Sequence, residues 1–322
     1  MFRYIGRRLL LLIPILLGLS LIVQLLIDIT PGDPARIIAG STATEEEYQK
    51  IRDDLKLDDP FFTRYTSFIK NIAQGDFGRS YANRRSVLED IAVRFPYTLR
   101  LVAMSICLAL LIGIPLGVYA ATHQYSYKDN IAILLSLFCV SMPNFWFALL
   151  IVQLFAVKFR ILPPSGVATW QGWIMPVVSL ALGFTATITR QTRSNILEVI
   201  RQDYIIMARA KGLSERKVLF RHALKNALIP VIMVAGSIFG ISLGGALVTE
   251  TIFSLPGLGT YVIAGLNGLD YPVIQGTILF LSAMFSVVIL LVDIIFAFVD
   301  PRIRSQYAKA KKKKEAIVSE EA

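Results

Sequence analysis

The chain contains little charge and very few cysteines or histidines. Of its 322 residues, 17% are charged, two are cysteines and two are histidines, whereas 55% are hydrophobic. Cys107 and Cys139 both fall in apolar segments, which favours small buried hydrophobic side chains over a disulfide or redox chemistry. His123 and His222 are far apart, and without an HExxH motif or a Cys/His cluster the sequence predicts no metal centre.

The sequence motifs of common hydrolases are also missing. There is no GxxxxGKS or GxxxxGKT segment to hold the phosphates of ATP, so we expect that the chain binds no cofactor and does not hydrolyse ATP itself. No serine lies in a GxSxG motif, which disfavours a membrane hydrolase. The sequence therefore predicts a protein that is not an enzyme.

Long apolar runs dominate what is present. The mean hydropathy is +0.59, a value typical of membrane proteins. Six apolar segments are long enough to cross about 30 Å of hydrocarbon, at residues 9–29, 101–121, 131–157, 173–188, 228–248 and 276–299. The first is about twice as long as the hydrophobic region of a signal peptide and lacks a small-residue cleavage site, so it predicts an uncleaved anchor.

The distribution of basic residues predicts the orientation of these spans. Twenty of the 33 Lys and Arg residues fall before the first span, between the second and third, between the fourth and fifth, and in the tail. Positive charge in short segments beside a membrane span belongs on the cytoplasmic side, so both termini are predicted to be inside. The net charge of +10 does not indicate nucleic-acid binding, because the basic residues cluster beside apolar segments and form no separate patch with stacking aromatics.

The basic segment at residues 190–227 has a regular pattern. Between Arg190 and Lys225 it carries nine basic residues against three acids. Four apolar residues at spacings of three and four predict one face of a helix: Ile196, Ile200, Tyr204 and Met207. Gly212 offers the left-handed residue that ends such a helix, and Leu213 can fold back on Ala208. Ser214 can then cap the next helix. A helix–glycine–helix with an apolar face suits docking into another protein, and a basic amphipathic loop lying on anionic lipid is the alternative.

The motifs of this segment and of the rest of the chain resemble a known family. Residues 206–212 (Ile-Met-Ala-Arg-Ala-Lys-Gly) and 221–226 (Arg-His-Ala-Leu-Lys-Asn) look like the EAA loop of bacterial ABC importer permeases, with matches at Ala208, Gly212 and Leu224. Three positions depart from that pattern in a way that looks like the peptide-transporter branch: Ile206, Met207 and Lys225. Further matches are Thr30-Pro31-Gly32-Asp33-Pro34, Gly75-Asp76-Phe77-Gly78, Ile252-Phe253-Ser254-Leu255-Pro256-Gly257-Leu258-Gly259 and Asp300-Pro301-Arg302. This ordered set covers almost the full length and resembles the B-type permeases of the oligopeptide/dipeptide/nickel family.

The resemblance implies both fold and activity. It implies an all-α integral membrane protein with six transmembrane helices, N-in and C-in, and the type I ABC importer permease fold. The chain would be the non-catalytic permease subunit of an ATP-driven importer of dipeptides or oligopeptides in the bacterial cytoplasmic membrane. Relatives also carry nickel chelates or glutathione-like solutes, and these solutes are alternatives. An ATP-independent channel or membrane scaffold is the alternative from another class, which the basic loop alone would permit.

The same resemblance implies the partners. A homologous second permease would form a heterodimer with this chain, and the translocation path would run between the two. Two cytoplasmic ATP-binding subunits would hydrolyse ATP with Mg, and an extracytoplasmic solute-binding protein would deliver the peptide. Membrane lipids would surround the complex, and nucleic acid would play no part. The resemblance assigns ATPase coupling to Ala208, Ala210, Gly212, Leu213, His222 and Leu224.

On this interpretation the chain divides into four parts. Residues 1–29 form the N-terminal anchor and first transmembrane helix, and residues 30–100 form an extracytoplasmic helical loop. Residues 101–300 form the permease core with five transmembrane helices and the coupling loop at 190–227, and residues 301–322 form a basic cytoplasmic tail.

The extracytoplasmic loop carries two helix-start signals. Thr44 and Glu47 have the spacing of a capping box that opens a helix through Leu57. Asp59 and Pro60 predict the N-cap and first residue of a second helix. These two helices either contact the binding protein or only stabilise the bundle.

Polar side chains within the spans are candidates for the translocation path: Ser141, Asn144, Gln153 and Thr185. In hydrocarbon such groups should face the bundle interior or a wet path. Pro143 lies among them, and membrane helices tolerate a proline where neighbours satisfy the freed carbonyl group. Asn144 and Gln153 are nine residues apart and fall on somewhat different helix faces. Hydrogen bonding between helices is the alternative role for each candidate.

Overall fold

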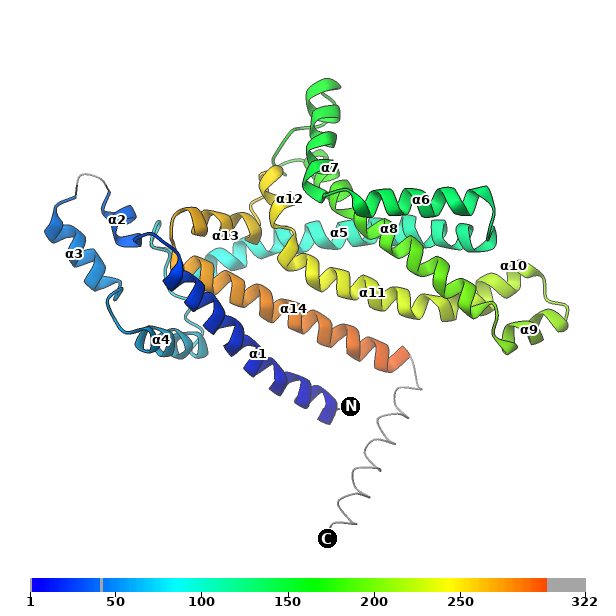
Figure 1. Cartoon of the computed structure of the whole chain (residues 1–322), viewed down its shortest axis with the longest axis horizontal. Coiled ribbons are helices and arrows are strands. Elements are labelled where there is room, and N and C mark those ends of the chain that lie inside the picture. The colour runs from blue at the N-terminus through cyan, green and yellow to red at the C-terminus, as the bar shows by residue number, and fades with distance from the viewer. Residues whose placement is uncertain (1, 41–42, 300–322) are drawn as a thin grey trace, which may run out of the picture. The chain divides into compact units, whose positions relative to one another are not determined.

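The computed structural model describes residues 2–40 and 43–299, and within these ranges it contains helices but no strand (Figure 1). The first half holds α1 (Phe2–Ile29), α2 (Pro34–Ala39), α3 (Glu45–Asp54), α4 (Phe61–Ala73), α5 (Val87–Thr122), α6 (Tyr127–Ser141), α7 (Asn144–Ile151) and the π-helix η1 (Val152–Lys158). The second half holds the 3₁₀ turn η2 (Trp170–Trp173), α8 (Ile174–Val199), α9 (Asp203–Ala210), α10 (Glu215–Lys217), the π-helix η3 (Val218–Ala223), α11 (Leu224–Gly245), α12 (Leu247–Ile252), α13 (Leu258–Asn267) and α14 (Tyr271–Val299). The predicted basic tail at 301–322 lies outside the described residues.

The described residues contain five candidate membrane spans, or the predicted six if one bent pair of helices counts as a span. Among the described residues, five helical segments are long and apolar enough to cross a membrane: Leu10–Ile29, Val87–Thr122, Trp170–Val199, Glu215–Gly244 and Tyr271–Ile295. The pair Tyr127–Ser141 and Asn144–Lys158 gives a sixth span if its two helices count as one. The prediction of an all-α membrane protein is therefore confirmed, with one span broken.

The break lies at Met142 and Pro143, inside the segment at 131–157 that was predicted to cross the membrane. Both residues are extended, with ψ of 127° at Met142 and 130° at Pro143, so the helical hydrogen-bond ladder stops there. Proline lacks an N–H donor and disfavours a helical conformation for the residue before it, and together these effects account for the break.

Two other spans are longer than predicted. α5 begins at Val87, so the predicted outer loop over 30–100 ends within this helix. Glu89 and Asp90 lie in its first turn, where negative charge interacts favourably with the helix dipole. α8 runs on to Val199, well past the predicted end at 188. Hydropathy alone detects the apolar part of a helix and not its polar extension beyond the bilayer.

The chain divides into two compact units, and the division falls within α5, α8, α11 and α14. The first unit holds the described residues of Met1–Met104, Pro143–Leu180 and Ile241–Ser286. One of its core clusters joins α1 to the start of α14 through Val23, Ile27 and Ile274. A second joins α5, α13 and α14 through five buried side chains: Val87, Ile91, Leu258, Tyr261 and Val273.

The second unit holds the described residues of Ser105–Met142, Ala181–Gly240 and Val287–Ala322. Its helices α5 and α8 approach closely at Gly117, where a Cβ would lie 2.5 Å from the Cβ of Thr192. Small residues permit such close approach of membrane helices. A core cluster of α5, α8 and α11 lies beside this contact: Val118, Ala121, Ile196, Leu197 and Ala227.

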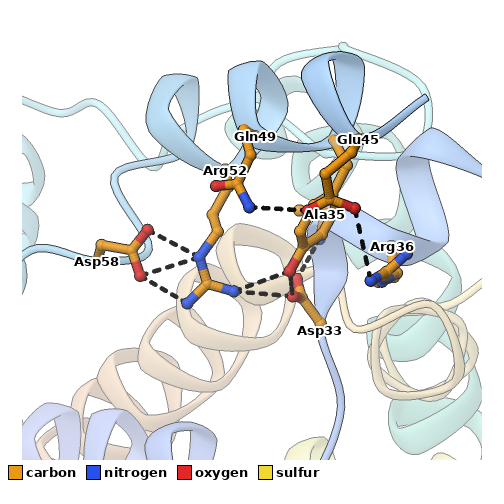
Figure 2. A network of polar contacts seen from close by, with 8 residues as sticks. Asp33, Ala35, Arg36, Glu45, Gln49, Arg52 and Asp58 are labelled. Atoms are coloured by element: carbon orange, nitrogen blue, oxygen red, sulfur yellow. Dashed lines mark hydrogen bonds and ion pairs between the residues drawn. The ribbon is translucent and has the colours of Figure 1, made fainter. Parts of the chain in front are cut away.

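The outer segment before α5 is held by a polar network in the first unit. Asp33 caps α2 by accepting a hydrogen bond from the Ala35 amide (2.8 Å), with Pro34 as the first helical residue. Figure 2 shows Arg52 between two carboxylates: it donates to Asp33 (3.0 Å) and, with two nitrogens, to Asp58 (2.5–2.9 Å). The Thr30–Pro34 motif therefore starts α2 and ties it to α3.

The helix starts of this segment were predicted with mixed success. The capping box of Thr44 and Glu47 is present, and α3 begins at Glu45 as predicted but ends at Asp54, before Leu57. The prediction that Asp59 caps the next helix is wrong, because Pro60 occupies the N-cap position of α4 and no side chain caps it. The Asp59 carbonyl instead accepts a hydrogen bond from Arg64 Nε (3.1 Å).

Candidate functional site

The turn after α9 has the geometry predicted for it. Gly212 has a φ of +76°, which lies in the left-handed region. Its amide donates to the Arg209 carbonyl (2.9 Å), and the Leu213 amide donates to the Ala208 carbonyl (3.4 Å). This pair of bonds is the Schellman motif, so the prediction of a helix ended by Gly212 with Leu213 folded back is confirmed. We call residues 203–223, which comprise α9, this turn, α10 and η3, the basic hairpin.

The apolar face predicted for the first helix is wrong. The chain leaves the helical conformation between α8 and α9, so Ile196 and Met207 do not share one helix. Tyr204 and Met207 are exposed, at 45% and 60%. The face that packs inside the hairpin instead consists of small and branched residues: Ile205, Ala208, Val218 and Ala223, each less than 9% exposed. The period was correct, but the break shifted the buried face by one residue.

The second helix of the hairpin is continuous with a membrane span. It begins at Glu215 after Ser214, as predicted, although the Ser214 side chain makes no capping hydrogen bond. It runs through α10 and η3 into α11 without a break, so Glu215–Gly244 forms one apolar helical segment. The π-helical turn η3 contains His222. Such wide turns recur at functional sites, and this one joins the basic hairpin to the span.

Two polar contacts hold the hairpin closed at its ends. At the turn, Arg209 donates two hydrogen bonds to the Glu215 carboxylate, from Nε (2.8 Å) and from a terminal nitrogen (3.2 Å). At the base, the Asn226 side-chain amide donates to the Tyr204 hydroxyl (2.9 Å). Because the Arg209–Glu215 pair is exposed, it adds little stability, and the buried face carries the packing energy.

The helix that follows the hairpin is also joined to α8 within the second unit. The side-chain amide of Asn195, buried on α8, donates to the backbone carbonyl of Ala227 on α11 (3.2 Å). Nearer the N-terminus of α8, Arg193 pairs with Asp129 at the start of α6. Polar contacts therefore join α8 to both α11 and α6 in this unit.

The coupling residues predicted from the EAA resemblance differ in burial, and one of them, Leu224, lies just after the hairpin at the start of α11. Ala208 is buried inside the hairpin, Ala210 and Gly212 are exposed, and Leu213, His222 and Leu224 are half-buried. Apolar side chains also lie on the outside of the hairpin: Tyr204, Ile206, Met207 and Phe220, each at least 45% exposed. The hairpin thus presents an apolar outer surface among basic residues. The assignment of the six residues to ATPase coupling stays a prediction.

The four path candidates are divided between the two units. In the second unit, Ser141 and Thr185 donate to carbonyls of their own helices, at Leu137 (2.9 Å) and Ala181 (2.8 Å). In the first unit, Asn144 opens α7 and Gln153 lies in η1, and both are exposed. Because the hydroxyls of Ser141 and Thr185 bond within their own helices, they need no other polar neighbour. The assignment of the four residues to the translocation path stays a prediction.

Sequence reasoning missed a buried carboxylate in the first unit. Glu250 on α12 is 0% exposed and accepts hydrogen bonds from the Thr98 hydroxyl (2.6 Å) and from the amides of Gly259 (2.7 Å) and Thr260 (3.3 Å). Burial raises the pKa of its carboxyl, and the bonds from Thr98 and the two amides act against that rise. A Cβ at Gly257 would collide with the carboxylate, so the Leu-Pro-Gly-Leu-Gly motif forms a cradle for Glu250. In the sequence, the two glycines of this motif, Gly257 and Gly259, were the signal that could have pointed to the buried carboxylate.

A sequence profile described as "Binding-protein-dependent transport system inner membrane component" matches residues 113–305, and the profile of its N-terminal region matches residues 1–102. The glutathione transport system permease protein GsiC of Escherichia coli is 39% identical over 304 residues, which cover 94% of this chain and 99% of the relative. The protein of the same name from Salmonella typhi is 40% identical over the same length.

Two solved structures have a similar fold. One is an inward-facing form of the MetNI methionine ABC transporter, with a TM-score of 0.56 and 18% identity over 66% of this chain and 97% of that chain. The other is an amino acid ABC transporter crystallised with histidines, with a TM-score of 0.50 and 16% identity over 67% of this chain and 94% of that chain. At these identities the likeness concerns the fold alone.

Proposed function

The chain belongs to the inner-membrane components of binding-protein-dependent transport systems and is a permease subunit of a bacterial ABC importer, and from this premise we propose that it imports small peptides, including glutathione-like ones. It is a multi-pass protein of the cytoplasmic membrane and is not the catalytic subunit. A partner permease, ATPases and a solute-binding protein complete such an importer.

The observation that carries the coupling part of the proposal is the basic hairpin. Its interior is packed by small and branched side chains, and its outer surface carries exposed Ile206, Met207 and Phe220. A closed hairpin with an apolar outer surface can enter a cleft on an ATPase without unfolding. We assign ATPase contact to this outer surface, together with Ala210 and Gly212 at the turn. Ala208 and Leu213 are assigned the internal packing that keeps the shape, and Leu224 the packing of the start of α11 against α5 and α8.

Motion would pass from the hairpin to the spans because the second helix of the hairpin continues directly into α11. ATP and Mg are proposed to be bound by the partner ATPases, which approach each other when ATP binds. The hairpin follows its ATPase, and because η3 continues into α11, that span must move with it. The Asn195–Ala227 contact carries the displacement to α8. Net import requires that the ATP-bound and free ATPases favour different conformations of the permease pair.

The solute class comes from the relatives and from the peptide-branch departures in the EAA-like loop. The relatives at 39–40% identity are named glutathione permeases, and glutathione is itself a small peptide with a γ-linkage. One class therefore includes both the relatives' solute and ordinary dipeptides and oligopeptides. In such importers the binding protein makes much of the solute choice.

The test is transport by the complete complex. The chain would be purified with its partner permease, ATPases and binding protein, placed in liposomes, and supplied with labelled dipeptides and labelled glutathione. We expect ATP-dependent accumulation of at least one peptide and stimulation of ATP hydrolysis by the same peptide. Accumulation of a non-peptide solute alone, or uptake that needs no ATP, would refute the proposal.

A further inference from the structure

A small cavity lined by both polar and apolar residues lies in the first unit. It is about 210 Å³ in volume and is bounded by the end of α1, the α3–α4 connection, α4, the loop after α4 and the start of α14. Pockets for drug-sized ligands hold roughly 300–1,000 Å³, so this cavity suits a smaller group, such as an amino acid or a dipeptide.

The wall of the cavity is aromatic. Phe68, Phe77, Tyr81 and Tyr271 all line it, and the rings of Tyr81 and Tyr271 meet edge to face with centroids 6.1 Å apart. Burial raises the pKa of Tyr81, so its hydroxyl stays neutral and can donate a hydrogen bond. Such a wall can pack against the apolar atoms of a small ligand while its hydroxyls bind the polar ones.

Four charged residues line the cavity. Two of them have structural partners, and two form no ion pair among the described residues. Arg64 and Asp76 already have structural partners: Arg64 donates to Asp28 (2.6 Å), and Asp76 accepts from the Gly78 amide (2.8 Å). Lys56 and Asp59, in contrast, form no ion pair with any residue that the structure describes. One unpaired cation and one unpaired carboxylate therefore border the same small space.

Lys56, one of the cavity-lining residues, has a left-handed backbone conformation. Its φ is +53°, and it occupies the left-handed position after α3, with the Leu57 amide donating to the Arg52 carbonyl (3.2 Å). Glycine or asparagine would adopt this conformation with less strain. Lys56 is an exposed residue of the cavity lining that adopts this conformation at the cost of local strain, and such strain is typical of functional positions.

We propose that this cavity binds a small zwitterion with a free amine and a free carboxylate, an amino acid or a short peptide. The ligand carboxylate pairs with Lys56, the ligand amine pairs with Asp59, and the side-chain amide of Asn71 serves the peptide group. The choice of a peptide ligand rests on the proposed function, whereas the requirement for both charges rests on Lys56 and Asp59. The site would hold solute beside the spans independently of ATP.

The test is protection of a cysteine placed in the cavity wall. Ser67→Cys lines the cavity, whereas Thr66→Cys, its exposed neighbour on α4, does not. Each would be made with Cys107→Ser and Cys139→Ser in the complex of both permeases and the ATPases. The membranes would contain neither ATP nor binding protein. The rate of labelling by an impermeant thiol reagent would be measured with glycylglycine at millimolar concentration, and with its N-acetylated, C-amidated form.

We expect glycylglycine to slow the labelling of Ser67→Cys and not of Thr66→Cys, and the blocked dipeptide to have no effect on either. Adding Lys56→Asn, which tolerates the backbone conformation, or Asp59→Asn should raise the half-protecting concentration about tenfold, the factor for one lost charged contact. Lys50→Asn and Asp54→Asn, exposed residues of α3 outside the cavity, are the matched controls and should leave it unchanged.

Three outcomes would overturn the proposal: no protection, equal protection by the blocked dipeptide, or protection only when the binding protein is added. The last would assign the cavity to protein docking. Because the assay uses no ATP, a failure of ATP-driven uptake would refute the proposed function without touching this site.

Discussion

Arg193 on α8 and Asp129 at the start of α6 form a two-bond ion pair in the second unit, with distances of 2.5 Å from Nε to Oδ1 and 2.6 Å from a terminal nitrogen to Oδ2. The Asp129 side chain is 1% exposed and that of Arg193 is 21% exposed. Asp129 also accepts a hydrogen bond from the Tyr125 amide (3.1 Å), where Tyr125 has a φ of +64°. The pair therefore fixes the loop between α5 and α6 against the helix that leads to the basic hairpin.

Removing one partner of this pair should be more damaging than removing both. Arg193→Leu leaves a buried carboxylate without its cation and should cost about 3–5 kcal/mol of stability. The double variant Arg193→Leu with Asp129→Leu should recover much of that loss, because no unpaired charge remains. Thermal unfolding in detergent of the two single variants and the double variant gives the coupling energy. Additive losses would show that the two side chains do not interact.

Gly212→Val should weaken ATPase association while leaving the spans intact. No atom lies within 4 Å of a Cβ at Gly212, so the penalty comes from φ alone and amounts to about 1–2 kcal/mol. Gly212→Asn should be milder, because Asn tolerates the left-handed region. The measurement is co-purification of the ATPases, with uptake of labelled peptides alongside.

Gly75→Val is the matched control for Gly212→Val. Gly75 follows α4 with a φ of +82°, a Cβ there would also meet nothing within 4 Å, and the residue belongs to the outer segment. It imposes a similar strain in the first unit, which does not contain the hairpin, and should not reduce ATPase association. Equal loss in both variants, or loss in neither, would mean that the hairpin is not the docking element.

The predicted orientation can be tested with two exposed positions. Cysteines at Thr66 on α4 and at Ser214 in the hairpin, with Cys107→Ser and Cys139→Ser, should differ in labelling by an impermeant thiol reagent on intact cells. Thr66→Cys should label, and Ser214→Cys should label only after the membrane is permeabilised. The reverse pattern would contradict the N-in, C-in prediction that follows from the basic residues.

Features fixed by neighbours in sequence were the predictable part of this structure. The Schellman turn at Gly212 and the capping box of Thr44 need only residues within six positions of each other, and both are present. The same local logic was wrong for Asp59, because a proline can itself occupy the N-cap position. The break at Pro143 was ambiguous for another reason: in a membrane, packing around a proline decides whether a helix bends or stops.

Features that depend on distant residues were not predictable from a single sequence. Asp129 and Arg193 are 64 positions apart, and Thr98 and Glu250 are 152 positions apart. Neither pair has a local pattern, so each carboxylate looked like an ordinary polar residue near an apolar segment. The small cavity of the first unit likewise combines residues from Gln24 to Gln275. Such sites arise from tertiary packing, which periodicity and capping rules do not describe.

The network around Asp33 predicts an acid-sensitive outer segment. Burial raises the pKa of the Asp33 carboxyl, but hydrogen bonds from Tyr48 and Ala35 and the charge of Arg52 outweigh this, and the pKa lies below its usual value. A lowered folded-state pKa stabilises the fold above the unfolded value of about 3.9, and that contribution is lost as the pH falls through the folded value.

Hydrogen exchange of α2 and α3 should therefore stay slow, after correction for the intrinsic rate, from neutral pH to about pH 4 and should accelerate below it. Asp33→Asn should remove this acid transition and weaken protection at neutral pH. Asp53→Asn, an exposed residue of α3, is the control and should behave like the unmodified chain. An acid transition that persists in Asp33→Asn would assign it to another carboxylate.

Glu250 should be essential for the packing of α13. One of its carboxylate oxygens accepts from Thr98 and the other from the amides of Gly259 and Thr260. Glu250→Gln keeps the shape, and the Thr98 hydroxyl can turn to accept from the new NH2 group, but the amides of Gly259 and Thr260 then donate to a neutral oxygen in place of a carboxylate. The loss of a hydrogen bond to a charged group should lower the free energy of unfolding by about 1.5–3 kcal/mol.

Gly257→Ala should be at least as damaging as Glu250→Gln, because its Cβ would collide with the Glu250 carboxylate and push α13 away from α12. Gly244→Ala is the matched control, since a Cβ there meets nothing within 4 Å, and it should leave stability unchanged. Thermal unfolding in detergent and limited proteolysis between α12 and α13 measure both effects. If Glu250→Gln and Gly257→Ala both unfold like Gly244→Ala, the cradle contributes no stability. The Leu-Pro-Gly-Leu-Gly motif would then need an explanation other than the burial of Glu250.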